Sequence, residues 1–372
     1  RRLRMENTTW RTDCEAFRLE RENVPVIKVD GKTADNSSFR YPGPEGSNFF
    51  LPAAGGGHTV DPRDRALDDL FEALAIGVKS YYEKTGAFKS LGIALSGGRD
   101  SMLTLLIAWR AAQLINARQG PQAPRASQIF AFYMPSKHSG GDTRHAATVL
   151  AEELGVSLQT IPIHDAVERE VQATVDMLGG QQPTELTRQN IQARIRGQRM
   201  WNWANSSGAL FLQTGDMSEK AVGYTTIGGD LEGALSVIAN VPKTVVIALL
   251  ERLEARFGFK GVSATLHTDP GPELADKQVA ENELMPFPVL DACLHLYAGE
   301  KMAPDEIAIA LKSLFPDYPA DTLSKWAHRF TKLFSQSIYK WVQSPLSLHV
   351  GSLDLDRERA LQMPVVQKNE WT

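Results

Sequence analysis

The chain has 372 residues and a formal net charge of −4 at pH 7, with 23% charged and 42% hydrophobic residues. This length favours one large or two smaller domains, and the slightly acidic balance argues against a nucleic-acid partner drawn by a positive field. No apolar run approaches the roughly 20 residues that a membrane helix needs. The two cysteines, Cys14 and Cys293, argue against a disulfide framework, so we expect a reducing, cytoplasmic setting.

Residues 1–64 are interpreted as a loop-rich arm, because Gly31–His58 is crowded with Gly, Pro, Ser and Asn and has no sustained period. The opening residues have no apolar central region, which argues against a signal peptide. The first residue is Arg1 rather than Met, so we expect the chain to be the downstream part of a longer protein. Helical spacing then begins near Asp61, a candidate N-cap, and stops near Gly86.

Short β-rich runs then alternate with helical segments. The expected strands are 90–96, 128–135, 157–163 and 208–215, and the expected helices are 100–118, 143–155, 164–178 and 187–205. This alternation predicts an α/β fold with a doubly wound, parallel, five-stranded sheet and helices on both faces. Ligands of such sheets bind beyond the carboxyl ends of the strands. Ser96, Pro135 and Thr214 fall at such ends, so we expect their loops to converge on one crevice.

The rest of the chain is predicted to be mostly helical. A long helix is expected over 244–257, a loop over 265–283, a helical tail over about 289–342, and irregular structure in the last thirty residues. We divide the chain into the arm (1–64), a catalytic domain (65–300) and a helical extension with an irregular tail (301–372).

The most informative stretch is the turn SGGRDS, Ser96 to Ser101, between an apolar strand and a helix. Bare N–H groups at a helix start bind anions, and Gly97 and Gly98 let the backbone approach a ligand closely. The turn lacks the GK[ST] of a kinase P-loop and is not GxGxxG. The carboxylate of Asp100 would repel a phosphate, but a bound Mg²⁺ between the two would reverse that effect.

The strand–SGGxDS–helix pattern resembles the ATP pyrophosphatase signature shared by NAD synthetases, GMP synthetases, asparagine synthetases and some tRNA-modifying enzymes. The stretches Phe132–Val156, Gln189–Thr244 and Pro270–Asp291 are similar to substrate loops of NAD synthetases in particular. The resemblance covers roughly residues 65–300. It implies a Rossmann-like ATP pyrophosphatase fold and cleavage of ATP between its α and β phosphates.

The resemblance also implies roles for individual residues. Asp100 and Glu219 would hold Mg²⁺ and, with Lys243, carry the catalysis. ATP and pyrophosphate would be bound by Ser96, Gly97, Gly98, Arg99, Asp100, Ser101, Met134 and Thr214. Deamido-NAD would be bound by Asn190, Arg194, Tyr224 and Asp230. In the closing loop Gly271 and Pro272 replace a hydroxyl found in many relatives, so no ligand contact is assigned there.

The implied reaction is the ATP-dependent amidation of deamido-NAD to NAD through an adenylated intermediate, with release of pyrophosphate and AMP. Residues 2–20 resemble the linker that follows the glutaminase domain of glutamine-dependent NAD synthetases. We therefore expect ammonia as nitrogen donor for this chain, and glutamine only through a glutaminase domain in the parent protein. The resemblance further implies a homodimer. Trp201 and Trp203 either pack at its interface or lie in the core.

Two other functions remain open at this point. One is another ATP pyrophosphatase ligase, resembling a GMP synthetase or a tRNA-modifying enzyme, although a pI near 6.1 argues against tRNA. The other is a non-catalytic nucleotide-binding regulator. Such a regulator would be expected to have lost Asp100, Glu219 or Lys243, and all of them are present.

Overall fold

The computed structural model describes residues 41, 49–54, 61–119, 128–137, 140–268, 280–356 and 360–366. Most of the expected N-terminal arm, with Cys14, and the part of the closing loop that holds Gly271 and Pro272 lie outside these residues.

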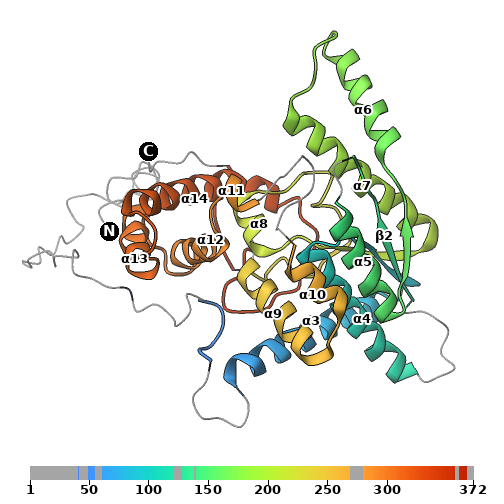
Figure 1. The fold of residues 1–372 in the computed structure, drawn as a ribbon, viewed down its shortest axis with the longest axis horizontal. Coiled ribbons are helices and arrows are strands. Elements are labelled where there is room, and N and C mark those ends of the chain that lie inside the picture. The colour runs from blue at the N-terminus through green and yellow to red at the C-terminus, as the bar shows by residue number, and fades with distance from the viewer. Residues whose placement is uncertain are drawn as a thin grey trace, which may run out of the picture. The chain divides into compact units, whose positions relative to one another are not determined.

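The centre of the fold is a parallel sheet of five strands in the order β3-β2-β1-β4-β5. Figure 1 labels strand β2 of this sheet. The strands are β1 (Ser90–Ala94), β2 (Gln128–Tyr133), β3 (Ser157–Thr160), β4 (Ala209–Gln213) and β5 (Leu235–Ser236). Every paired neighbour runs parallel, which confirms the predicted sheet. The four strands located from the sequence are each two or three residues shorter than expected, because the pairing ends before the apolar run does. No run in the sequence located the fifth strand, β5, which has only two residues.

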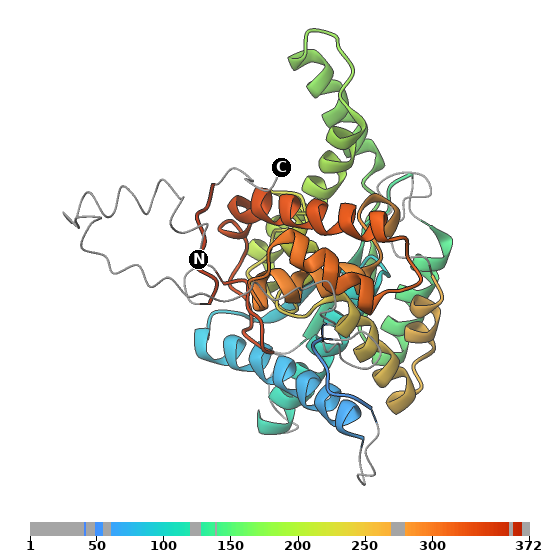
Figure 2. The same ribbon diagram turned by 90° about the vertical axis from the view of Figure 1, so that its left-hand side faces the viewer.

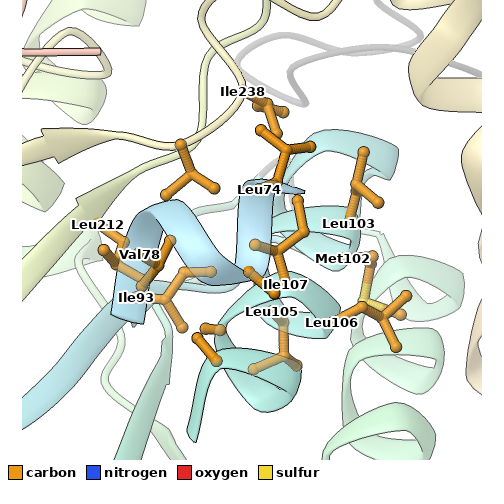
Figure 3. Close-up of a cluster of buried hydrophobic side chains, with 14 of the residues drawn as sticks. Leu74, Val78, Ile93, Met102, Leu103, Leu105, Leu106, Ile107, Leu212 and Ile238 are labelled. Carbon is orange, nitrogen blue, oxygen red and sulfur yellow. The ribbon is translucent and has the colours of Figure 1, made fainter. Parts of the chain in front are cut away.

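Helices cover both faces of the sheet, as predicted. One face carries α3 (Pro62–Thr85), α4 (Arg99–Gln119), α5 (Gly141–Leu154), α9 (Lys243–Phe257) and α10 (Lys260–Leu266), and the other carries α6 (His164–Met177) and α7 (Glu185–Ser207). Successive side chains of a strand point to opposite faces of the sheet, so each strand contributes residues to a hydrophobic core on either face. In β1, Leu91 and Ile93 join the first core, whereas Ala94 packs against the second. Figure 3 shows side chains of α3, α4, β1 and β4 meeting in the first core.

The predicted start and end of α3 are confirmed. The Asp61 side chain accepts a hydrogen bond from the backbone N–H of Arg63 at 2.8 Å, and Gly86 closes the helix with a left-handed φ of 62°. Such caps satisfy backbone groups that a helix leaves free at its ends.

A second group of helices forms its own hydrophobic core. Its elements are α8 (Met217–Val222), α12 (Phe287–Leu294), the π-helix η4 (His295–Gly299), α13 (Pro304–Leu314) and α14 (Ala320–Trp341). The short helix α11 (Ala280–Glu283) precedes α12 in the chain. In Figure 2 the long red α14 lies beside the orange α13, and α14 also contacts α8. The expected helical tail is therefore several helices, and α8 is a short helix that the sequence did not predict. Cys293 is fully buried in α12, as expected for a core residue.

The C-terminal segment returns to the edge of the sheet. The backbone N–H of Ser236 in β5 donates to the carbonyl of Leu346 at 2.8 Å, and the N–H of Leu348 donates to the carbonyl of Ser236 at 3.2 Å. Ser347 thus pairs with Ser236 as an isolated parallel bridge. Within the described ranges, no helix has the length and apolar character to cross a membrane.

Candidate active site

The site lies where the connections of the sheet diverge. From β1 the chain continues to β2 and β3 on one side, whereas β4 and β5 lie on the other side of β1. Ligands of open parallel sheets bind at this reversal, beyond the carboxyl ends of the strands. Ser96 follows β1 and Thr214 follows β4, and both line one cavity of about 590 Å³. The predicted crevice is therefore present between these two strand ends. Pro135, the third strand end named from the sequence, is not among the residues that line this cavity, so that part of the prediction is wrong.

The glycine turn between β1 and α4 is held by its own hydroxyl groups. Ser96 Oγ and Ser101 Oγ lie 3.0 Å apart, and the backbone N–H of Gly98 donates to Ser96 Oγ at 3.2 Å. Gly97 has a φ of 86°, and a Cβ at this position would lie 2.0 Å from the carbonyl oxygen of Thr143. Only glycine fits this conformation and this contact. The turn is thus a tight cradle at the start of a helix.

A buried charge cluster lies beside the turn. The Lys243 ammonium Nζ lies 2.6 Å from Asp100 Oδ2 and 3.1 Å from Glu219 Oε1, and donates a hydrogen bond to each. Asp216 Oδ2 is also 2.6 Å from Nζ, as an ion pair outside hydrogen-bonding geometry. The Lys243 side chain is only 5% exposed, so bulk water screens these attractions little.

Burial and repulsion from neighbouring charges change the protonation of Glu219 and Asp216. Burial raises the pKa of Glu219 to about 7, with a further contribution from the charge of Asp100. Burial likewise raises the pKa of Asp216 well above its ordinary value. For Lys243 burial acts in the opposite direction, but attraction to Asp100, Asp216 and Glu219 outweighs it and raises the pKa of the ammonium. A nearby cation would therefore stabilise the ionised carboxylates of this cluster.

The same acids fit the Mg²⁺ that the resemblance implies. One oxygen each of Asp100, Asp216 and Glu219 lies within 4.8 Å of the others. Asp100 Oδ1 is buried and has no hydrogen-bond partner among the described residues. Carboxylate oxygens are the ligands that Mg²⁺ prefers, together with phosphate oxygens.

Local structure explains why these residues meet. Asp216 is the N-cap of α8, and its Oδ1 accepts from the backbone N–H of Glu219 at 2.8 Å. Lys243 is the first residue of α9, after Pro242. Asp216 is missing from the residues predicted from the sequence. It directly follows Thr214 and Gly215 at the end of a strand, and that position was the signal that could have found it.

The residues predicted to bind the dinucleotide all line the same cavity: Asn190, Arg194, Tyr224 and Asp230. Asn190 and Arg194 lie one turn apart on α7, and Arg194 Nε donates to the carbonyl of Ile227 at 3.1 Å. The Tyr224 hydroxyl donates to Glu283 Oε2 at 2.5 Å. Asp230 Oδ1 accepts from the backbone N–H of Thr226 at 2.5 Å, and burial raises the pKa of Asp230 to about 6.

Three residues of the predicted ATP site lie differently from the rest. Gly97 does not line the cavity, because it packs against the backbone of Thr143. Met134 does not line the cavity either. Its side chain is 6% exposed and packs in the core between the sheet and α6–α7. The Arg99 guanidinium lines the cavity but donates to the carbonyls of Leu266 and Thr268, at 3.2 and 2.9 Å, near the end of α10.

The cavity also has lining residues that the sequence did not suggest. Lys340 of α14 donates to the carbonyls of Gly223 and Thr225, both at 2.7 Å. Glu232 accepts a hydrogen bond from Trp201 Nε1 at 2.8 Å. Trp203 packs on Phe132 with ring centroids 4.8 Å apart, so both tryptophans lie in or beside the core under α7.

Comparison with known proteins gives one family. Residues 70–330 match the family model described as NAD synthase. The chain is 32% identical to the glutamine-dependent NAD(+) synthetase of Thermotoga maritima over 291 residues, which are 78% of this chain and 46% of that protein. It is 37% identical to the Synechocystis sp. glutamine-dependent NAD(+) synthetase over 240 residues, 64% of this chain and 40% of that protein. The chain thus spans less than half the length of these two curated relatives.

Solved structures show the same fold. A glutamine-dependent NAD(+) synthetase from Cytophaga hutchinsonii superposes with a TM-score of 0.68 at 22% identity, covering 81% of this chain and 54% of that one. The NMN synthetase from Francisella tularensis superposes with a TM-score of 0.52 at 20% identity, covering 72% of this chain and 96% of that one. At these identities the likeness is one of fold. It confirms the Rossmann-like fold expected from the sequence.

Proposed function

Because the chain belongs to the NAD synthase family, we propose that it catalyses the ATP-dependent amidation of deamido-NAD to NAD, with release of pyrophosphate and AMP. The observation that carries this proposal is the meeting of the glycine turn with Asp100, Glu219 and Lys243 in one cavity. This arrangement supports binding of a nucleotide polyphosphate next to a cation.

The first step joins the substrates. The nicotinate carboxylate of deamido-NAD attacks the α-phosphorus of ATP, the bond to the bridging oxygen of the β-phosphate breaks, and pyrophosphate leaves. The N–H groups and hydroxyls of the Ser96–Ser101 turn hold the departing pyrophosphate. The Lys243 ammonium lies where charge develops on the phosphate, and Arg194 suits the dinucleotide phosphates through bidentate contacts.

Asp100 and Glu219 would hold Mg²⁺, and Asp216 adds a carboxylate to the same cluster. When bound, the ion would neutralise charge on the triphosphate. The protein residues themselves bind and orient the reactants, and no protein nucleophile takes part. Positioning and electrostatic support therefore supply the catalysis.

The second step makes the amide. Ammonia attacks the carbonyl carbon of the adenylated dinucleotide, AMP leaves with the electron pair of the broken C–O bond, and the nitrogen loses a proton. We propose free ammonia as the donor for this chain, with glutamine serving only through a glutaminase domain of a longer parent protein. We also propose a homodimer, a cytoplasmic location and no nucleic-acid or membrane partner.

The decisive experiment measures NAD and AMP formed from deamido-NAD and MgATP, with ammonium compared against glutamine. Equal amounts of NAD and AMP with ammonium alone are expected. Efficient use of glutamine by this chain would overturn the proposed nitrogen source. AMP formation with XMP or tRNA in place of deamido-NAD would favour another ATP pyrophosphatase, and ATP binding without any AMP would favour a regulator.

A further inference from the structure

The helix that begins with Lys243 lacks a cap of its own. The N-cap residue of α9 is Pro242, whose ring has no hydrogen-bond acceptor for the first N–H groups of the helix. Asp291, on α12, supplies the acceptor instead. Its Oδ2 accepts from the backbone N–H of Thr244 at 2.9 Å and from the Thr244 hydroxyl at 2.7 Å. The start of α9 is therefore capped by a side chain 47 residues further along the chain.

The other oxygen of Asp291 reaches Lys243 through one intermediary. Asp291 Oδ1 accepts from the Ser218 hydroxyl at 2.5 Å. The same hydroxyl oxygen accepts from the backbone N–H of Lys243 at 2.8 Å. Asp291 thus accepts a hydrogen bond directly from the N–H group of Thr244, the second residue of α9, and is linked to the N–H group of Lys243, the first residue, through the Ser218 hydroxyl.

Ser218 also connects this network to the acids. It lies in α8 between Asp216 and Glu219, which both face the Lys243 ammonium. Asp291 therefore ties together α8, which carries the acids, and α9, which carries the cation.

The network is buried and charged. Asp291 is 2% exposed and Ser218 is fully buried. Burial raises the pKa of Asp291, while hydrogen bonds from Ser218 and Thr244 act in the opposite direction. Burying a carboxylate here costs desolvation free energy that an apolar residue would not, but the positive end of α9 and three hydrogen bonds donated to Asp291 offset this cost.

We propose that Asp291 is a positioning residue for the pyrophosphate site. It fixes the backbone of Lys243 relative to the acids of α8, so that the ammonium faces the leaving pyrophosphate. The proposal rests on the proposed function for the identity of that ligand. Asp291 itself does not line the cavity.

The test is a double-mutant cycle on the affinity of the full chain for magnesium pyrophosphate, measured by calorimetry. Asn has one acceptor oxygen and cannot accept on both sides of the network, so Asp291→Asn is expected to weaken binding about tenfold, the scale of one charge-assisted hydrogen bond. In a Lys243→Gln background the same change is expected to have less than about a twofold effect, because the group being positioned is gone.

Cys293→Ala is the matched control, since Cys293 is fully buried two residues further along α12 and belongs to the hydrophobic core. It should lower stability and leave pyrophosphate affinity unchanged. Equal weakening by Asp291→Asn in both backgrounds, or an equal loss of affinity in Cys293→Ala, would overturn the proposal. If Asp291→Asn does not fold, Ser218→Ala goes through the same cycle with the same expected outcomes.

A kinetic readout separates this proposal from the proposed function. In the amidation assay Asp291→Asn should lower kcat and leave KM for deamido-NAD unchanged, because Arg194 and Asn190 lie on α7. A rise in KM with unchanged kcat would contradict positioning through Lys243. A wild-type chain that forms no NAD would overturn the proposed function alone, because the binding cycle requires no dinucleotide.

Discussion

Lys243 Nζ lies 2.6 Å from Asp216 Oδ2, and both residues are buried. Asp100 and Glu219 reach the same ammonium from α4 and α8. When all of these groups are ionised, one positive charge faces three negative ones. The remaining negative charge suits a divalent cation, which brings a polyphosphate to the site.

Replacement of Lys243 by Gln should affect both catalysis and folding. We expect kcat to fall by about 10² to 10³, the usual cost of removing a group that stabilises developing charge. Loss of the ammonium also leaves Asp216 buried without its ion-pair partner, so the free energy of unfolding in the absence of Mg²⁺ should fall by about 3 kcal/mol. NAD formation and urea unfolding measure the two effects. Lys312→Gln, an exposed lysine on α13, should change neither.

Asp100→Asn and Glu219→Gln test the magnesium ligands separately. Each variant should need about tenfold more Mg²⁺ for half-maximal NAD formation, since each removes a charged oxygen from the cluster. Magnesium titrations at saturating ATP give this value directly. Glu251→Gln, an exposed acid of α9, should keep the wild-type requirement. Unchanged requirements in both site variants would show that these acids do not hold the ion.

Gly97→Ala should be more damaging than an equivalent change at Gly86. Both glycines have a left-handed φ, 86° and 62°, so alanine costs about 1–2 kcal/mol at either position. At Gly86 the added methyl group meets no atom within 4 Å, whereas at Gly97 it lies 2.0 Å from Thr143 O. Urea unfolding should therefore show a larger loss for Gly97→Ala, together with loss of ATP binding. Equal losses would mean that the turn can rearrange without cost.

The buried carboxyl of Asp230 predicts a pH dependence of stability. Its pKa rises from 3.8 to about 6 on folding, so the folded state holds this proton more tightly than the unfolded state. The stabilisation is complete below about pH 4 and is lost as the pH rises through 6, on the order of 2–3 kcal/mol in total. Asp230→Asn should remove this component from unfolding free energies measured between pH 4 and 7. Asp317→Asn, an exposed acid, should keep the wild-type slope.

Arg194→Ala should weaken binding of the dinucleotide selectively. Arg194 lines the cavity from α7, whereas Glu219 and Lys243 lie on α8 and α9, so KM for deamido-NAD should rise about tenfold with kcat within about twofold. Steady-state kinetics with each substrate varied distinguish this from a defect in ATP use. Arg169→Ala on α6, an exposed arginine, is the control. A rise in KM for ATP instead would place the arginine at the other substrate.

The sequence predicted the sheet well because its signals are strong over four or more residues. Apolar runs bounded by turns located β1 to β4, and the glycine turn followed from the same boundaries. β5 and α8 were missed because a strand of two residues and a helix of six carry no measurable period. Their positions depend on contacts with β4 and α14 rather than on local pattern.

The site residues that follow strand ends could be predicted from the sequence, whereas those on distant helices could not. Ser96 and Thr214 follow strand ends that the strand-end rule brings together, and Glu219 lies shortly after Thr214 in α8. The role of Lys243, the first residue of α9, was predicted only from the resemblance to NAD synthetases. Asp291 and Lys340 come from helices α12 and α14, and only the packing of the second core brings them near. No spacing in the sequence encodes that packing.

The pairing of Ser347 with Ser236 has a consequence for biosynthesis. Strand β5 pairs with β4 on one side, and its other side pairs with a segment that is synthesised about 110 residues later. The ribosome must therefore extend the chain through the whole helical region before this edge of the sheet is covered. Until then two residues of open backbone remain available to foreign strands. Nascent chains stalled before residue 346 should accordingly be the ones that chaperones retain.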